Sequence, residues 1–440
     1  MVNCDINIVG AKLLKGSDLI KADISIANGK IIKIGKHSNI PKAEKEIDAN
    51  GLLALPGLID VHVHLRDMQL SHKEDFYSGT CGAAAGGFTT VLDMPNTIPP
   101  TDSCERLKEK IDVAKQKAMV NIGFHAMLIK KVHELAGLAQ MGIISFKLYL
   151  NKSKQDLDVR NDELLCKLMN ECAQLNTPLT IHAEEISEVK EIDSLNNHIK
   201  NRSEELEVNA LRRILGLVKK SRCQAHICHL SASESVLIMK EERNSGLNIS
   251  CEVTPHHLFL SKDLFKEHGA LILTDPPLRN KNTVNNLFNA LKEGVISIVA
   301  SDHAPHTLKE KLCSNANEVP PGIPGLETTL PLLLTEVNSK RLTLKRIVDI
   351  LAKDPARIFH LDNKGALEEG KDADLTLIDL KAEHVIRSDK LFTKAEYSPF
   401  DGLKCKGRAV KVFVSGNQVM ESGEIVENPG IGKIITRDMR

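Results

Sequence analysis

The sequence predicts an α/β protein in which a (β/α)8 barrel is accompanied by a small β-domain assembled from the N- and C-terminal segments. Three observations predict this fold. Eight short apolar runs recur between residues 55 and 301, helical patterns separate most of them, and both chain ends consist of short strand-like runs. The 440 residues suffice for a barrel of about 250 residues and a smaller domain.

The two ends of the chain share one pattern. Residues 1–55 alternate short apolar runs with Gly, Asn and Lys turns, as in ADISIANGKIIKIG, which is typical of β-hairpins. Residues 365–440 continue in the same way, with ADLTLIDL and AVKVFVSGNQVMESGEIV. We therefore expect these segments to form one small β-domain and residues 56–364 to form the barrel.

The predicted barrel strands are apolar runs of seven to nine residues. In chain order they are LPGLIDVHV, FTTVLDM, VNIGFHAML, GIISFKLYL, PLTIHAE, CQAHICHL, LNISCEV and GVISIVAS. Stretches between them, such as NDELLCKLMNECAQLN and EELEVNALRRILGLVKK, carry apolar residues three or four positions apart between charges. That spacing is typical of amphipathic helices. Eight such strand–helix units favour a closed barrel.

Composition argues against several classes of partner. The chain has 58 Lys and Arg against 58 Asp and Glu, so nothing favours binding to nucleic acid or to an anionic membrane. Its ten cysteines are scattered without a C-x-x-C motif, which fits a reducing cytosol. No apolar run reaches the roughly 20 residues of a membrane helix, and the N-terminus lacks the charged start of a signal peptide. We expect a cytoplasmic protein with a small-molecule substrate.

Polar side chains fall where the predicted strands end. In barrels of this kind the C-terminal ends of the strands carry the chemistry, whereas the strands themselves are apolar. The polar residues are His62, His64, Asn96, Lys147, His182, His229, Glu252 and Asp302. Because alternate residues of a strand point to one face, the two histidines of DVHVHLRD can converge on one point.

Four histidines, one lysine and one aspartate of this set form a mixed nitrogen and oxygen ligand set, which suits zinc and related divalent ions. Any one of these histidines alone would more often be an ordinary hydrogen-bonded residue. Six such groups at matching positions are hard to assign to packing, because unpaired buried polar groups are destabilising. We therefore expect a metal centre built from His62, His64, Lys147, His182, His229 and Asp302.

Two members of this set have distinct expected roles. A protonated Lys147 beside divalent cations would be repelled, so its side chain either loses the charge or points away. An unprotonated amine can take up carbon dioxide, and the resulting carbamate can bridge two metals; a surface lysine with a buried stem is the alternative. Asp302 could bind a metal through one oxygen and act as general base through the other, or it could cap the next helix.

Nine motifs carry a resemblance to a known family. They are PGLIDVHVHLRD, KEDFYSGTCGAAAGGFTTVLDMPNT, FKLYL, IHAE, HICHLS, CEVTPHHLFL, DPPLR, SDHAPHT and PPGIPGLETTLPLLL. Together they resemble the dihydroorotases of the amidohydrolase superfamily, in the class related to the multifunctional animal pyrimidine enzyme, over nearly the whole chain. H-x-H, S-D-H and GKDADL are general to the superfamily, whereas HLR together with MPNT is more specific.

The resemblance implies a reaction and a cofactor. The reaction is the reversible hydrolysis of L-dihydroorotate to N-carbamoyl-L-aspartate in de novo pyrimidine synthesis. The cofactor is two divalent metal ions, with zinc the expected metal. A hydroxide and the carboxylated lysine would bridge the ions, with the aspartate as general base and acid. The implied ligands are His62, His64 and Asp302 for one ion, His182 and His229 for the other, and carboxylated Lys147 for both.

The resemblance also implies which residues bind the substrate. Arg66, Asn96 and His306 are similar to the residues that hold the substrate α-carboxylate. The chemistry agrees, because an arginine supplies paired donors to a carboxylate and an amide adds another. The alternative for Arg66 is a salt bridge with Asp67 or Glu74, which are close in sequence.

The chain departs from the family pattern at a few positions. Met68 and Gln69 stand where Pro-Gly is expected, so the turn there can differ. Asp275 stands where the family more often has asparagine. Cys228 and Glu252 match residues that hold an additional zinc in the animal enzyme, and packing around the ligands is the alternative that we prefer slightly.

Two other functions stay open from the sequence. An allantoinase or hydantoinase would open a similar cyclic amide with the same metal apparatus, although the HLR and MPNT residues argue against it. A non-catalytic scaffold relative would have lost its metal ligands, which are all present here. The family further suggests a homodimer and an association with aspartate transcarbamoylase. The polar segment 151–159 is positioned to act as a lid.

Overall fold

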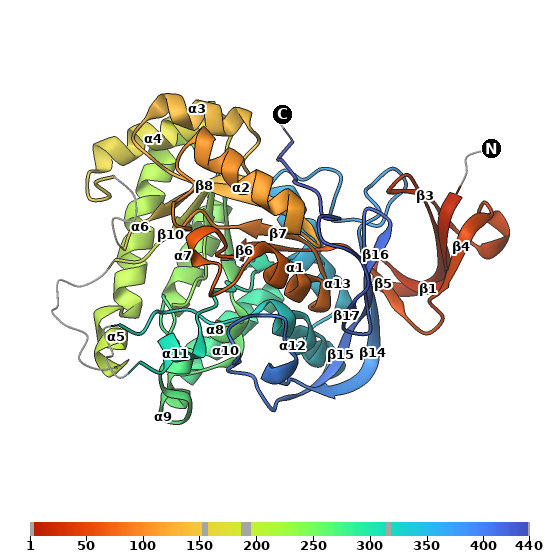
Figure 1. Cartoon of the computed structure of the whole chain (residues 1–440). Coiled ribbons are helices and arrows are strands. Elements are labelled where there is room, and N and C mark those ends of the chain that lie inside the picture. The colour runs from red at the N-terminus through yellow and green to blue at the C-terminus, as the bar shows by residue number, and fades with distance from the viewer. Residues whose placement is uncertain (1–3, 152–156, 186–194, 314–317, 439–440) are drawn as a thin grey trace.

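A barrel of parallel strands forms the larger part of the protein (Figure 1). The computed structural model describes residues 4–151, 157–185, 195–313 and 318–438. The eight strands pair in sequence order as one sheet, from β6 to β13. Their bounds are β6 Leu58–Val63, β7 Phe88–Asp93, β8 Asn121–Met127, β9 Ser145–Tyr149, β10 Leu179–His182, β11 Ala225–Ile227, β12 Ile249–Val253 and β13 Ile298–Val299.

The segment after β13 brings the two ends of this sheet together. His303 forms a parallel bridge with Val63, and the backbone N–H of His64 donates to the carbonyl oxygen of His303 at 2.8 Å. Each of the eight predicted apolar runs contains one of these strands. The predicted (β/α)8 barrel is therefore confirmed in a nearly closed form.

Amphipathic helices cover the outside of the barrel, as their spacing predicts. In α6, Leu211, Leu215 and Val218 recur on one face and are buried, and the Ser203 hydroxyl accepts from the N–H of Leu206 to cap the first turn. The longer helices are α1 Phe76–Ala85, α2 Cys104–Lys117, α3 Val132–Gln140, α4 Asp162–Gln174, α6 Glu204–Ser221, α7 Ser233–Asn244, α10 Lys281–Glu293 and α12 Leu326–Asn338. The shorter ones are α5 Leu195–Asn201, α8 Pro255–Phe259, α9 Phe265–His268, α11 Leu308–Lys311, α13 Leu344–Val348 and α14 Asp354–Ile358.

The two chain ends form a second, mixed sheet, which confirms the predicted β-domain. Figure 1 shows its N-terminal strands in red beside its C-terminal strands in blue. The pairing order is β17-β16-β15-β14-β5-β1-β2-β3, and β4 pairs with β1. The bounds are β1 Cys4–Lys15, β2 Asp18–Ala27, β3 Lys30–Gly35, β4 Ala43–Asp48, β5 Leu53–Pro56, β14 Leu375–Val385, β15 Lys404–Val414, β16 Asn417–Glu421 and β17 Glu424–Ile425.

The predicted run LPGLIDVHV is divided between the two sheets. Strand β5 ends at Pro56 in the terminal sheet, and β6 begins at Leu58 in the barrel. Gly57 lies at the crossing, where an added Cβ would come within 2.3 Å of the Thr89 hydroxyl oxygen. Only a residue without a side chain fits so close an approach.

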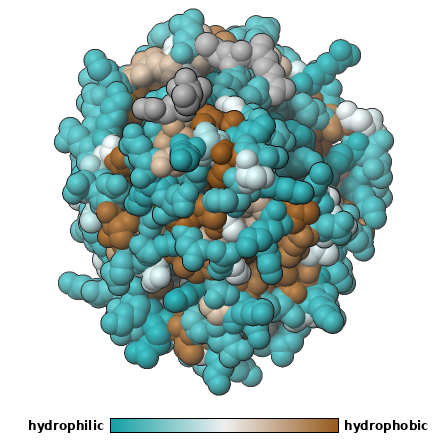
Figure 2. Space-filling view, turned by 90° about the vertical axis from the view of Figure 1, so that its right-hand side faces the viewer, coloured by the Kyte–Doolittle hydropathy of each residue, from teal (hydrophilic) through white to brown (hydrophobic). Residues whose placement is uncertain are grey.

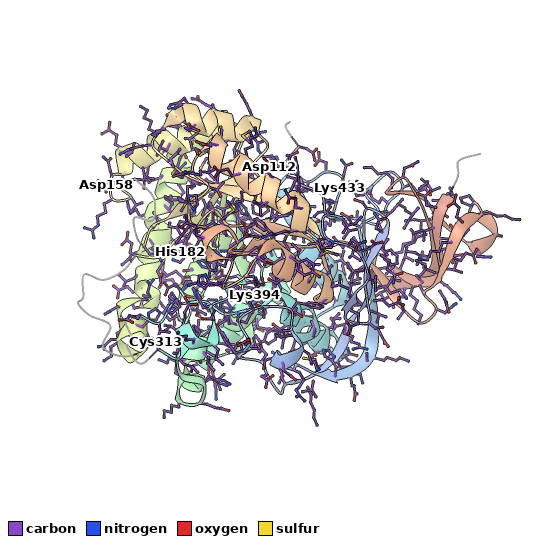
Figure 3. All side chains as sticks on the ribbon, viewed as in Figure 1. Asp112, Asp158, His182, Cys313, Lys394 and Lys433 are labelled. Atoms are coloured by element: carbon purple, nitrogen blue, oxygen red, sulfur yellow. The ribbon has the colours of Figure 1, made fainter. Side chains whose placement is uncertain are left out.

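A buried ion-pair network joins the sheets. Asp374 of GKDADL accepts hydrogen bonds from Asn121 of β8 at 2.8 Å, from Lys364 at 2.5 Å and from the N–H of Ser415 at 2.7 Å. The C-terminal segment around Lys433 (labelled in Figure 3) also returns to the barrel, where the backbone N–H of Ile122 donates to the carbonyl oxygen of Lys433 at 2.9 Å. The domain boundaries at residues 55 and 365 stay a prediction.

Apolar side chains are concentrated in the interior. The largest buried cluster lies between the barrel strands and the helices that cover them, and a second one lies in the terminal sheet. Figure 2 shows the face on the side of the terminal sheet, where hydrophilic side chains dominate and hydrophobic ones form small groups. Among the described helices, none is long and apolar enough to span a membrane.

We predict that Asp374→Ala lowers the free energy of unfolding by about 3–5 kcal/mol, because it breaks a buried ion pair and leaves Lys364 with only the more exposed Asp372 as its counterion. The side chains of Asp374 and Lys364 are only 4% and 7% exposed. Urea denaturation followed by circular dichroism measures the change. The control is Lys30→Met, which breaks the more exposed pair with Asp372 and should cost at most about 1 kcal/mol. Equal small losses in the two variants would contradict the structural role of Asp374.

Candidate active site

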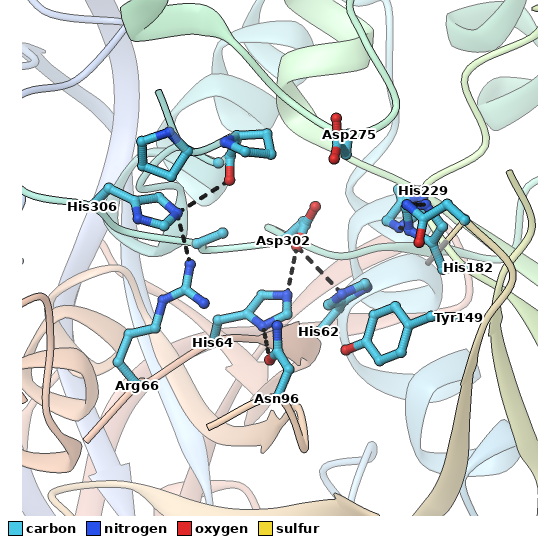
Figure 4. Close-up of a pocket in the computed structure, with 15 residues that line it drawn as sticks. His62, His64, Arg66, Asn96, Tyr149, His182, His229, Asp275, Asp302 and His306 are labelled. Carbon is cyan, nitrogen blue, oxygen red and sulfur yellow. Dashed lines mark hydrogen bonds and ion pairs between the residues drawn. The ribbon is translucent and has the colours of Figure 1, made fainter. Parts of the chain in front are cut away.

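A polar cavity of about 210 Å³ opens at the C-terminal ends of the barrel strands (Figure 4). Eight of the predicted site residues line it: His62, His64, Arg66, Asn96, His182, His229, Asp302 and His306. The other three, Lys147, Cys228 and Glu252, are buried in the barrel and do not line the cavity. The remaining lining residues are Tyr149, Asn151, Asp275, Ala304, Pro320, Pro321 and Gly322.

His62, His64 and Asp302 form one cluster of converging donor atoms. The Asp302 Oδ1 atom lies 3.3 Å from His62 Nε2 and 3.2 Å from His64 Nε2. His62 Nδ1 is 2.5 Å from Glu252 Oε1, and His64 Nδ1 is 2.6 Å from Asn96 Oδ1. Both acceptors are oxygens, so each imidazole donates from Nδ1.

In neutral imidazoles this arrangement leaves the Nε2 lone pairs of both histidines facing the Asp302 carboxylate. Burial lowers the pKa of His62, although the charges of Asp302 and Glu252 oppose the shift. Burial likewise raises the pKa of Asp302, against the charge of His62. Three electron-rich atoms this close repel one another unless a cation lies among them, so the donor set fits a divalent metal ion.

His182 and His229 form a second group beside the first. His182 Nδ1 lies 2.9 Å from His229 Nε2, and His182 Nε2 lies 3.1 Å from Glu184 Oε2. His182 Nε2 also lies 2.7 Å from the Asn151 amide, whose oxygen is buried without a hydrogen bond. With that amide turned so that its oxygen accepts, a proton on His182 Nε2 is shared with Glu184 and leaves the Nδ1 lone pair facing His229. Burial and the neighbouring charge of His182 hold the pKa of His229 well below its usual range, which favours a neutral ligand.

Lys147 is buried next to these histidines. Its Nζ atom lies 2.7 Å from Cys228 Sγ, and that sulfur clusters with His62 and His229. The amine also lies 5.1 Å from the centre of the Tyr149 ring. Within the described part of the chain no carboxylate forms an ion pair with this lysine. The alternative that Lys147 is a surface lysine is therefore wrong, since its side chain is fully buried.

Glu252 acts mainly on the histidines around it. Its carboxylate accepts from His62 Nδ1, from His226 Nε2 at 3.0 Å and from the backbone N–H of His229 at 3.2 Å. Burial alone would raise its pKa, but the charge of His62 and the hydrogen bonds from His226 and His62 lower it well below the usual range. A carboxylate with three donors is suited to orient the imidazoles rather than to bind an ion itself.

Arg66 faces the cavity from the other side. Its Nε donates to the carbonyl oxygen of Pro305 at 3.3 Å, and one terminal nitrogen lies 3.1 Å from His306 Nε2. The alternative of a salt bridge with Asp67 or Glu74 is wrong, because Asp67 pairs with Lys117 and Glu74 lies against His303. No described carboxylate forms an ion pair with this guanidinium.

The turn after Arg66 is unusual. Arg66, Asp67 and Met68 have φ angles of 56°, 46° and 50°, in the left-handed region. Such residues are individually unfavourable by about 1–3 kcal/mol and are found at binding sites that hold them in place. Here the Asp67 carboxylate accepts from the N–H groups of Met68 and Phe76. Met68 and Gln69, the two residues that stand where Pro-Gly is expected, lie in a short 3-10 turn at Met68–Leu70.

Asp275 lines the cavity and is held by two basic side chains. Arg202 reaches Asp275 Oδ2 at 2.9 Å and His198 Nε2 reaches Oδ1 at 3.1 Å. Burial alone would raise the pKa of Asp275, but the charge of Arg202 and the bond from His198 lower it overall. The two basic side chains therefore suit a carboxylate at position 275, where the family resemblance predicts an amide.

Sequence reasoning did not assign a role to Tyr149, Asn151 or the Pro320–Gly322 segment. Tyr149 could have been found, because it follows Lys147 by two positions in one strand and so points to the same face. Of the predicted lid 151–159, Asn151 lines the cavity, and residues 152–156 lie outside the described residues. The lid stays a prediction.

Known proteins resemble this chain along nearly its whole length. The sequence model of the Amidohydrolase family matches residues 53–419. A dihydroorotase of Methanosarcina acetivorans is 36% identical over 97% of this chain and 96% of its own length. A dihydroorotase of Methanothermobacter thermautotrophicus is 38% identical over 93% and 94%. The solved structure of L-hydantoinase from Arthrobacter aurescens matches with a TM-score of 0.93 at 29% identity, over 99% of this chain and all of that one.

We predict that Glu252→Gln weakens metal binding by about 10–100-fold without changing the number of ions bound, since it disturbs the hydrogen bonds that orient the imidazoles. Competition with a chromogenic chelator measures the affinity, and elemental analysis measures the stoichiometry. Cys228→Ser is the matched comparison and should leave both nearly unchanged. Loss of one bound ion in both variants would instead assign these residues to an additional metal site.

Proposed function

The chain belongs to the amidohydrolase family, and we propose that it is a dihydroorotase, which hydrolyses the cyclic amide of L-dihydroorotate to N-carbamoyl-L-aspartate and catalyses the reverse reaction. The single observation that carries the substrate assignment is the buried guanidinium of Arg66, which borders the cavity with no acid partner among the described residues. A carboxylate on the substrate is the partner that this group requires. The relatives named dihydroorotase support the same assignment.

The histidine clusters support a centre of two divalent ions, with zinc as the proposed metal. His62, His64 and Asp302 would hold one ion, and His182 with His229 would hold the other. Lys147 would take up carbon dioxide, release a proton and provide a bridging carbamate. Bound ions of this kind polarise a carbonyl group and lower the pKa of a water molecule to about 7.

Three residues are suited to bind the substrate carboxylate. Arg66 offers two N–H donors and His306 lies 3.1 Å from it, so both side chains border the same part of the cavity. Asn96 uses its oxygen to accept from His64, which leaves its amide nitrogen as a donor. A carboxylate held at this end presents the ring amide to the histidine clusters, and that orientation brings the reacting groups together.

Asp302 is suited to move the proton. In hydrolysis a water oxygen adds to the ring carbonyl carbon, the carbon–nitrogen bond breaks, and the nitrogen gains a proton. Asp302 Oδ1 faces His62 and His64, while Figure 4 shows its second oxygen pointing away from them. That oxygen would take the proton from the water and deliver it to the departing nitrogen.

The hydantoinases are the second candidate, because the structural likeness to L-hydantoinase is high. Hydantoin substrates need not carry the carboxylate that Arg66 would bind. Steady-state assays of the metal-loaded protein with L-dihydroorotate, hydantoin and allantoin decide between them, and we expect L-dihydroorotate to be strongly preferred. Preference for hydantoin would reject the proposal, and no turnover of any ring would favour the scaffold. The homodimer, the association with aspartate transcarbamoylase and the cytoplasmic location stay predictions.

We predict that Asp302→Asn lowers kcat by about 10²–10⁴-fold while substrate still binds, because an amide cannot accept the proton. Single-turnover kinetics and equilibrium binding on protein of equal metal content measure the two effects. Near-normal turnover in a correctly metallated variant would show that another group moves the proton.

We predict that Arg66→Met lowers kcat/KM for L-dihydroorotate by roughly 10–100-fold, since a buried charged hydrogen bond is worth about 1.5–3 kcal/mol. The loss should be selective. Dihydrouracil, which lacks the carboxylate, should be a poor substrate for both proteins and differ little between them. An equal proportional loss on the two compounds would mean that Arg66 supports the structure of the site rather than the carboxylate.

A further inference from the structure

We propose that Lys73 is a positioning residue that fixes the tautomer of His306, so that the imidazole turns an Nε2–H donor toward the cavity beside Arg66. Lys73 does not line the cavity and lies on the far side of His306 from it. That this N–H donates to a substrate carboxylate rests on the proposed function. The tautomer of His306 does not depend on it.

The contacts of Lys73 determine which ring nitrogen carries the proton. Its Nζ atom lies 3.1 Å from His306 Nδ1 and 2.7 Å from Glu310 Oε1, and its side chain is 14% exposed. The Lys73 ammonium thus forms an ion pair with the Glu310 carboxylate. An ammonium has only donors, so His306 Nδ1 must accept from it. A neutral imidazole has one N–H group, which is then on Nε2.

The surroundings of Nε2 agree with this tautomer. His306 Nε2 lies 3.1 Å from the carbonyl oxygen of Pro321, to which an N–H can donate. It also lies 3.1 Å from the terminal nitrogen of Arg66, which is itself only a donor. Two N–H groups therefore lie side by side at the cavity wall. A substrate carboxylate that accepts from Arg66 would share the Nε2–H with the Pro321 carbonyl and relieve the repulsion between the two N–H groups.

A doubly protonated or reversed imidazole would not serve this purpose. Burial lowers the pKa of His306, and the positive charges of Arg66, Lys73 and Lys311 lower it further, so the imidazolium form is disfavoured. If Nδ1 carried the only proton, that N–H would oppose the Lys73 ammonium. Nε2 would then present a lone pair, which repels an anionic substrate.

Steady-state kinetics with L-dihydroorotate test the effect on binding. Lys73→Met should raise KM by about tenfold and change kcat less than about threefold, because both tautomers of His306 then become populated. Lys73→Arg keeps a cationic donor and should restore most of the affinity. Lys309→Met is the matched control, since Lys309 borders the same outer surface cavity as Lys73 but is exposed on α11. It should leave KM unchanged. Equal effects of Lys73→Met and Lys309→Met would overturn the proposal.

Nitrogen NMR of histidine-labelled protein tests the tautomer without any substrate. The His306 signals are assigned by their loss in His306→Gln. In the wild type and in Lys73→Arg, we expect Nδ1 to be unprotonated and Nε2 protonated, whereas Lys73→Met should show a mixture. A protonated Nδ1 in the wild type, or an unchanged spectrum in Lys73→Met, would overturn the proposal. If L-dihydroorotate is not turned over, the proposed function fails while this measurement still decides the role of Lys73.

Discussion

The buried amine of Lys147 is the constraint around which the site is organised. A buried ammonium without a counterion is unfavourable by several kcal/mol, and the described residues offer this lysine only a thiol and an aromatic ring. Conversion to a carbamate would replace an unpaired cation by an anion, which the proposed metal ions would neutralise. The histidines around it, held by Glu252, Asn96 and Glu184, fit the same arrangement.

Two chemically different groups of side chains border the cavity on opposite sides. Imidazoles and the Asp302 carboxylate converge on one side. Arg66 contributes a positive charge on the other side, next to His306, where the proposed substrate carboxylate would bind. Asp275 adds a carboxylate whose charge is balanced by Arg202. Because these groups sit on different strands and loops, their geometry depends on a rigid barrel. The network around Asp374, which joins β8 to the terminal sheet, contributes to that rigidity.

The sequence predicts the barrel well because its strands are buried on both faces and therefore appear as continuous apolar runs. The spacing of His62 and His64 also gives their convergence directly. The sequence could not predict contacts between residues that are far apart along the chain. Lys73 and His306 are 233 positions apart, and His62 and Glu252 are 190 apart. The acids next to Arg66 in sequence point elsewhere in the structure, because the left-handed turn at Asp67 redirects the chain.

A crystal structure of the metal-loaded protein, prepared with bicarbonate, tests directly whether Lys147 is carboxylated and lies between two metal ions. We expect a planar carbamate on Lys147 Nζ with one metal ion on either side, one bound by His62, His64 and Asp302 and the other by His182 and His229. A bare amine on Lys147, with its nitrogen turned away from fully occupied metal ions, would contradict it.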